Sequence, residues 1–183
     1  MSGIHSDGTL KKYPTPEPTT KGAIAAAVGD LDALKSLPIS EFNQAIDEHG
    51  NTLLIWAADR GQNECLTYIL SQITDTNRGI INERGYLGNT AIGRAARGGH
   101  LSCVEILLKQ DEINPNIANE KMQYPLHFAA FKKHLPIVQC MLDSGKCDTY
   151  VQDRKGRMPE EDTSVEEIKN AILNYKREHP SSE

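Results

Sequence analysis

The sequence has few of the features that mark a secreted, membrane-spanning or nucleic-acid-binding protein. Its 183 residues carry a net charge of −5, so no basic excess attracts phosphate groups. No apolar run approaches the roughly 18–20 residues that cross a membrane, and residues 1–12 lack the apolar core of a secretion signal. The four cysteines do not form a disulfide framework and indicate reduced thiols. We therefore expect a cytoplasmic or nuclear protein that binds neither nucleic acid nor membranes.

The motifs of metal sites and catalytic centres are also missing. His127, His134, Cys140 and Cys147 lie close together in the sequence, but none of their spacings matches a Cys-x-x-Cys or His-x-x-x-His pair. The sequence contains no nucleophile elbow, Gly-rich phosphate loop or paired carboxylates. We expect no metal, no cofactor and no enzymatic activity.

One pattern recurs along the chain. A Gly-Asn-Thr start, an Ala-Ala pair and a closing glycine occupy residues 50–61 and again residues 88–99, and a variant occupies residues 122–134. The starts at residues 50, 88, 122 and 156 are separated by 38, 34 and 34 residues. A period of this length is typical of stacked repeat proteins, whose units bury an apolar face only against their neighbours. Such a protein is expected to bind along its extended surface.

Each unit is predicted to fold as two short antiparallel helices. Thr52 and Thr90 stand where a helix N-cap belongs, and Pro125 and Pro159 stand at the first helical position. The five units are predicted at residues 21–46, 47–81, 82–115, 116–149 and 150–175. Residues 1–20 and 176–183 are predicted to be disordered or extended tails. The end units are degenerate copies, as expected where an outer face meets solvent.

The three central units resemble ankyrin repeats. The motif of that family, Gly-x-Thr-Pro-Leu-His-x-Ala-Ala-x-x-Gly-His, is matched in pieces by residues 50–61, 88–100 and 125–134. In the fourth unit Lys133 replaces the motif glycine, so we expect Lys133 to adopt a left-handed conformation at a cost of roughly 1 kcal/mol. The resemblance implies an all-α ankyrin-repeat solenoid of helix-turn-helix units with short β-hairpin-like loops. It also implies a non-catalytic protein-protein interaction module, a scaffold or adaptor, that binds through its concave helix face and hairpin tips.

The register of the repeats selects candidate partner-binding residues. At the hairpin tips they are Glu48, His49, Leu87, Glu120, Lys121 and Arg154; on the first helices they are Asp59, Arg60, Arg97, Phe131 and Lys132; in a column along these helices they are Trp56, Arg94 and Phe128. Large aromatics and arginines are frequent hot spots of interfaces. The alternative for Trp56 and Phe128 is packing between neighbouring helices. Phe131 aligns with Asp59 and Arg97, so an exposed aromatic is expected there.

The partner is expected to be another protein. Arg60, Arg97 and Lys132 form a basic stripe that would attract an extended or acidic segment, although three solvated charges are the alternative interpretation. We expect a monomer that recognises one such partner. A regulatory inhibitor or chaperone that masks a partner's functional site is the first alternative. An enzyme or small-ligand binder with an atypical groove site is the second.

Overall fold

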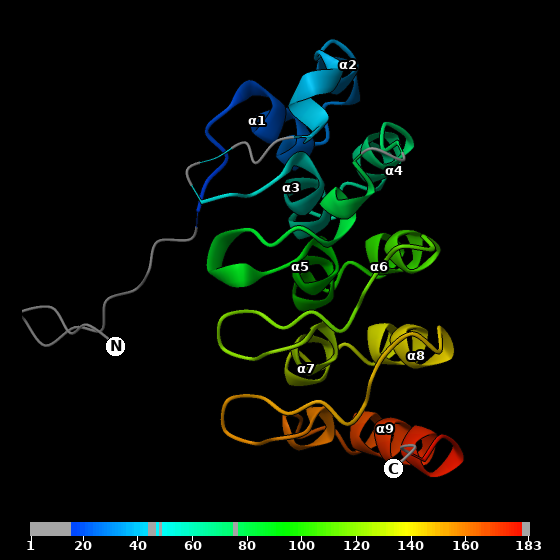
Figure 1. Cartoon of the computed structure of the whole chain (residues 1–183). Helices are drawn as coiled ribbons and strands as arrows, with labels where there is room; N and C mark the ends of the chain where they lie inside the picture. Colours follow the sequence, from blue (N-terminus) through cyan, green and yellow to red (C-terminus); the bar gives the residue numbers. More distant parts are fainter. Residues whose placement is uncertain (1–15, 44–46, 48, 75–76, 181–183) are drawn as a thin grey trace, which may run out of the picture.

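The chain forms a stack of helix pairs in two columns (Figure 1). This computed structural model describes residues 16–43, 47, 49–74 and 77–180. The inner column consists of α1 (Lys21–Val28), α3 (Leu53–Asp59), α5 (Ala91–Gly98) and α7 (Pro125–Phe131). The outer column consists of α2 (Leu31–Lys35), α4 (Asn63–Ser71), α6 (Leu101–Leu108), α8 (Leu135–Asp143) and α9 (Glu166–Glu178). Short 3-10 turns are η1 (Ile39–Asn43), η2 (Arg78–Asn82), η3 (Tyr86–Gly88) and η4 (Pro159–Glu161).

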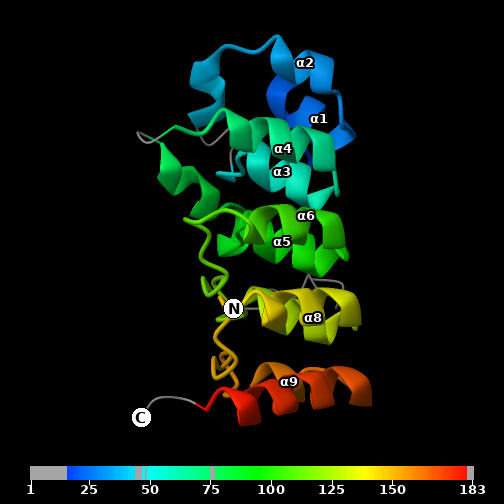
Figure 2. The same cartoon turned by 90° about the vertical axis from the view of Figure 1, so that its right-hand side faces the viewer.

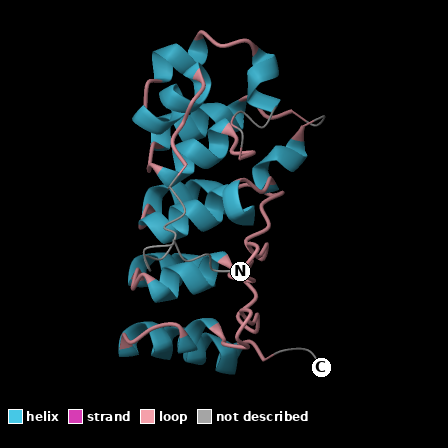
Figure 3. Cartoon of the chain, turned by 90° about the vertical axis from the view of Figure 1, so that its left-hand side faces the viewer, coloured by secondary structure: helices cyan, strands magenta, loops and turns pink. Residues whose placement is uncertain are grey.

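The stacking and the all-α class confirm the predicted solenoid. Figure 2 shows the outer helices α4, α6, α8 and α9 one beneath another. Figure 3 shows helices and loops without a strand in the part of the chain that is drawn in colour. Between successive units the loops project beyond the inner helices (Figure 1). These loops are hairpin-like, because the Gly85 N–H donates to the Asn89 carbonyl at 3.0 Å and the Asn119 N–H to the Gln123 carbonyl at 2.9 Å.

The inner helices begin and end where the motif predicts. The hydroxyl oxygens of Thr52 and Thr90 accept the backbone N–H groups of Ile55 and Gly93, at 3.2 and 3.3 Å. These caps satisfy donors that the first turn of a helix leaves unpaired. Thr20 caps α1 in the same way. Gly61 and Gly99 have φ values of 71° and 82°, the left-handed conformation that ends a helix.

One continuous apolar seam runs through the stack. The alanine pairs at residues 57–58, 95–96 and 129–130 are fully buried where α3, α5 and α7 pack side by side. Their small side chains let the helix backbones approach closely. Behind them the outer helices contribute Leu66, Leu107 and Met141, none of them exposed to solvent. Burial of each such side chain stabilises the fold by roughly 1.5–3 kcal/mol, and no unit could bury it alone.

The last unit departs from the two-helix pattern. Its first segment is the single 3-10 turn η4, at the position where the sequence carries three consecutive acids. Lys176 pairs with Glu160 at 2.6 Å, and Arg157 pairs with Asp162 at 2.7 Å. The second helix, α9, is regular and buries Ile168 and Ile172 against the stack. Its opposite face is charged and closes the seam toward solvent.

Candidate functional site

The candidate site is the inner groove, which we define as the surface between the projecting hairpins and the inner helices α3, α5 and α7. At the level of α5 and α7 this groove deepens into a hollow of about 150 Å³, the hairpin pocket. Its walls include Leu87 and Lys121 from two hairpins, Arg97 from α5, and Phe128, Phe131 and Lys132 from α7 and its end. Six of the predicted contact residues therefore line one hollow.

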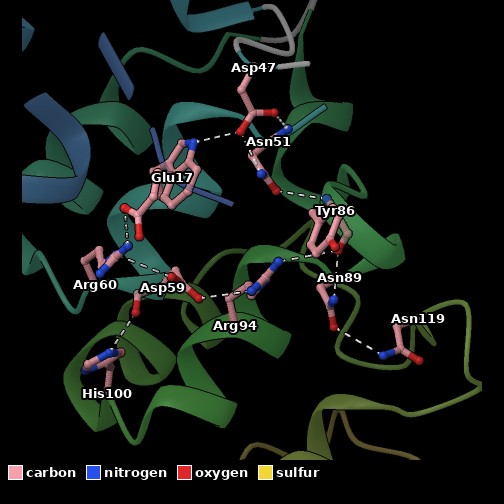
Figure 4. A network of polar contacts seen from close by, with 11 residues as sticks. Glu17, Asp47, Asn51, Asp59, Arg60, Tyr86, Asn89, Arg94, His100 and Asn119 are labelled. Carbon is pink, nitrogen blue, oxygen red and sulfur yellow. Dashed lines mark hydrogen bonds and ion pairs between the residues drawn. The ribbon is translucent and has the colours of Figure 1, made fainter. Parts of the chain in front are cut away.

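At the level of α3 the inner groove carries a segment of the chain itself. Glu17, in the extended stretch before α1, places a carboxylate oxygen 3.3 Å from the Arg60 guanidinium (Figure 4). The neighbouring Pro16 is buried. The Arg60 guanidinium lies 5.8 Å from the centre of the Trp56 ring, within the range of a cation–π contact. Arg60 thus already has partners within the chain.

A second ion pair joins α3 to α5. The Asp59 carboxylate lies 3.4 Å from the Arg94 guanidinium and 3.6 Å from that of Arg60 (Figure 4). Burial lowers the pKa of Arg94, Asp59 opposes this effect, and the nearby cation Arg97 lowers the pKa further. Arginine remains protonated in proteins, so the repulsion from Arg97 acts between two positive charges. Asp59 is therefore needed to balance Arg94.

The predicted column of large side chains lies behind the surface. Trp56, Arg94 and Phe128 are 2%, 6% and 7% exposed. The Trp56 indole N–H donates to Asp47 at 3.2 Å, and Arg94 donates to the Tyr86 carbonyl at 3.5 Å. Each of these hydrogen bonds holds an inner helix against the loop that precedes it in the same unit. The burial of Trp56 and Phe128 agrees with their alternative interpretation as packing residues.

Phe131 lies at the surface of the inner groove. Its side chain is 57% exposed, and the Lys132 ammonium lies 6.0 Å from the centre of its ring. Arg97 covers the buried Phe128 ring at 5.9 Å. Met122, on the preceding hairpin, is a further exposed apolar residue. Phe131 therefore presents apolar surface to solvent with a cation beside it.

The hairpin tips differ in how far their residues are engaged. His49 is exposed and contacts the Tyr86 ring at 4.9 Å, while Glu48 lies outside the described residues. Leu87 is half-buried and has a φ of 57°. Arg154 donates to the Glu120 carbonyl at 2.8 Å, which joins the last two hairpins. Lys121 is exposed at the rim of the hairpin pocket.

Buried asparagines support the inner groove and were not among the predicted site residues. The Asn51 side-chain oxygen accepts the Tyr86 N–H of the next hairpin at 2.9 Å. Asn89 and Asn119 are joined through their side chains at 3.3 Å, again across two hairpins (Figure 4). The signal was present, because Asn51 and Asn89 each follow the first glycine of the repeated pattern. Only the structure shows that these amides bridge one unit to the next.

Cys103, Cys147 and His127 are buried at structural positions. Burial raises the pKa of Cys103 to about 11 and that of Cys147 to about 12, so both thiols stay protonated and unreactive at neutral pH. His127 is buried and donates from Nε2 to the Arg157 carbonyl at 3.0 Å. No group of three or more His, Cys, Asp or Glu side chains among the described residues is arranged to hold a metal ion. None of the described helices is long and apolar enough to cross a membrane.

A larger hollow, of about 520 Å³, lies on the opposite side of the stack. It is formed between the outer helices α6 and α8, by residues that include Leu101, Leu108, Pro136 and Cys140. None of the predicted contact residues lines it, and its Cys140 thiol has a pKa raised chiefly by burial. The inner groove therefore concentrates the candidate contacts, although its hollow is the smaller of the two.

These features define a class of protein: a stack of helical repeats with an open, extended groove. The chain belongs to the ankyrin repeat family, since the family model for ankyrin repeats, in 3 copies, matches residues 23–119 and residues 74–153. Ankyrin repeats are protein-interaction modules, and the match indicates no catalytic family.

Individual relatives share the repeats and are much longer. The chain is 33% identical over 118 residues to ankyrin repeat-containing protein ITN1 of Arabidopsis thaliana, covering 55% of this chain and 20% of that protein. It is 30% identical over 103 residues to synphilin-1 of Mus musculus, covering 55% and 10%. It is 27% identical over 155 residues to E3 ubiquitin-protein ligase XBAT33 of Arabidopsis thaliana, covering 80% and 28%. The chain thus spans less than a third of each of these relatives.

Proposed function

We propose that the chain is a non-catalytic scaffold or adaptor that binds one partner protein through the inner groove and the adjoining hairpin tips. The observation that carries this proposal is Phe131, a largely exposed aromatic ring beside the hairpin pocket. Burying such a ring on a partner removes apolar surface from water at about 25 cal/mol per Å². Aromatic anchors surrounded by polar residues are the usual centres of protein interfaces.

The same proposal extends to the setting of the protein. The buried, protonated thiols suit a reducing compartment, so we place the protein in the cytoplasm or the nucleus as a monomer. The ligase activity named for XBAT33 is not carried over, because the chain matches only 28% of that protein. Regulation of a partner by masking its functional site is the second candidate. The ion pair of Glu17 with Arg60 supports it, because it shows that an extended segment can lie against that surface.

The proposal is tested by affinity capture from a cell lysate with paired variants. Phe131→Ala together with Arg97→Glu removes the anchor and reverses a charge of the hairpin pocket. We expect the partner recovered by the wild type to fall at least about 10-fold, because hot-spot truncations typically cost 2 kcal/mol or more.

The matched control changes the opposite face. Lys109→Glu with Gln139→Ala alters α6 and α8 by a similar amount of charge and volume, and recovery should stay at the wild-type level. Circular dichroism must show equal helicity for all three proteins. Equal recovery with both double variants would mean that the inner groove is not the binding surface.

A further inference from the structure

The cations of the inner groove fall into two sets. Arg60 and Arg94 are matched within the chain by Glu17 and Asp59. Arg97, Lys121 and Lys132 line the hairpin pocket, and no carboxylate of the described residues pairs with any of them. Three uncompensated positive charges thus surround one hollow in a protein whose net charge is −5.

The positive charge of the hairpin pocket acts on the interior as well. Arg97 repels Arg94, which is buried, and lowers its pKa. An anion placed against Arg97 would offset this repulsion while forming charge-assisted hydrogen bonds of its own. The pocket floor offers Asn89 and Asn119, whose side-chain amides already bond each other and the hairpin backbone. The donors that remain in the pocket include the three cations.

A contact within the chain shows which kind of group such a cation binds. At the level of α3, Arg60 lies against the Trp56 ring and receives a carboxylate from the extended segment that contains Pro16 and Glu17. Between α5 and α7, Arg97 lies against the Phe128 ring of the following unit at nearly the same distance. Both arrangements place an arginine over an aromatic ring, within one unit in the first case and between two units in the second. Of these two arginines, only Arg60 has a carboxylate partner among the described residues.

We propose that the hairpin pocket binds an acidic, extended segment of a partner protein. A Glu or Asp of that segment would lie among Arg97, Lys121 and Lys132, and an adjacent apolar side chain would cover Phe131. This proposal rests on the proposed function and names the chemistry of its partner. Single-stranded nucleic acid also combines anions with rings that stack on aromatics, but the overall negative charge of the chain opposes a polyanion beyond the pocket.

The experiment is a selection of random 12-residue peptides displayed on phage against the full-length chain. We expect enriched peptides to carry Asp or Glu next to an apolar residue. A synthetic copy of the most enriched peptide is then measured by fluorescence anisotropy. Arg97→Gln with Lys132→Gln should weaken its binding about 10-fold. Each exposed charge pair adds only a modest amount to the binding free energy, and salt screens it. Lys109→Gln with Lys169→Gln, an equal charge change on the outer helices, should leave the dissociation constant unchanged.

A second arm assigns the effect to the carboxylate. A peptide in which Gln replaces each Asp and Glu should bind the wild type about 10-fold more weakly than the original peptide. Its dissociation constant should be the same for the wild type and for the Arg97→Gln, Lys132→Gln variant. Two results would contradict an acidic partner: enriched peptides without Asp or Glu, or an acidic peptide that binds the Arg97→Gln, Lys132→Gln variant as tightly as the wild type. Either result would leave the proposed interaction module unaffected. Enrichment no higher than on a bare surface overturns both proposals. A 12-nucleotide oligothymidine that binds more tightly than the peptide overturns the choice of a protein segment.

Discussion

The Asp153 carboxylate shows how a single side chain closes a hairpin. Its two oxygens accept the backbone N–H groups of Lys155 and Arg157 at 2.7 and 3.0 Å and the Arg157 guanidinium at 2.7 Å. Burial alone would raise the pKa of this carboxyl, but these donors together lower it to about 2. Asp47 and Asn119 accept backbone N–H groups in the same way in the hairpins of the second and fourth units. The ionised form of Asp153 is therefore part of the folded state.

This depressed pKa predicts how stability depends on pH. The stabilisation is complete above the unfolded-state pKa of about 3.9 and is lost as the pH falls through the folded-state value of about 2. Asp153→Asn should lower the free energy of unfolding at pH 7 by about 1–2 kcal/mol, after allowance for solvent screening. In urea titrations the difference from the wild type should shrink between pH 4 and pH 2.5. Asp111→Asn, an exposed change, is the control, and a difference that stayed constant with pH would contradict the linkage.

Single residues also show where prediction from the sequence ends. Phe131 was expected at the surface because its aligned neighbours are polar, and it is exposed. The contact of Glu17 with Arg60 joins residues 43 positions apart and follows no spacing rule. The hairpin pocket likewise depends on how far each hairpin folds over the helix beside it. Repeat register identifies residues that face the same surface, but not which of them meet.

A residue just beyond each of α3, α5 and α7 has a positive φ, which is strained in one unit and relaxed in the two others. Gly61 and Gly99 enter the left-handed region without a Cβ, whereas Lys133 has a φ of 63° at the same position, which confirms the conformation predicted for it. α7 also lacks the side-chain cap of α3 and α5, because Tyr124 stands in place of their threonine. Both departures lie in the fourth unit, which carries Phe131 and Lys132.

Relief of this strain predicts a more stable variant. Lys133→Gly should raise the free energy of unfolding by about 1 kcal/mol, because glycine adopts a positive φ without steric cost. The melting temperature, followed by circular dichroism, should rise by a few degrees. Lys109→Gly is the matched control, since Lys109 ends α6 with a right-handed φ of −73° and should lose stability. A lower melting temperature for Lys133→Gly would mean that the lysine side chain stabilises the turn.

Helix boundaries were largely predictable because they depend on local chemistry. Thr52, Thr90 and the turn glycines act within one helical turn, so their roles follow from their positions in the motif. The last unit was harder, because η4 forms where acids find partners on α9 and in the adjacent loop. Lys176 and Arg157 supply those partners, and their contacts depend on the packing of the whole unit.

At the scale of the molecule, each unit contacts its immediate neighbours through one seam. Packing runs from α1 to α3, α5 and α7, and from α6 to α8 and α9. In such a stack, stability is approximately the sum of unit and interface contributions. The period alone predicted this organisation, since a repeat of this length cannot bury its apolar face by itself. Residues 1–15 and 181–183 lie outside the described residues. Residues 176–178 belong to α9, so the helix extends into the segment predicted as the C-terminal tail.

Nearest-neighbour coupling predicts a local response to a distant cavity. Ile168→Ala empties a fully buried site on α9 and should cost about 2–5 kcal/mol. Hydrogen exchange measured by mass spectrometry should rise in α9 and α8, while α1 and α3 keep their protection. Ile92→Ala in the central α5 is the comparison and should affect the units on both sides. An equal rise in all helices with Ile168→Ala would show that the stack opens as one cooperative unit.

The amide links between hairpins have a consequence for how this architecture can change over time. The Asn51 side-chain oxygen accepts from the hairpin of the third unit and that of Asn89 from the hairpin of the fourth, so two consecutive junctions use the same acceptor group. A duplicated internal unit would find matching donors and acceptors on both flanks. Recognition surface can therefore be lengthened by whole modules while the terminal units, which alone tolerate solvent, stay as they are.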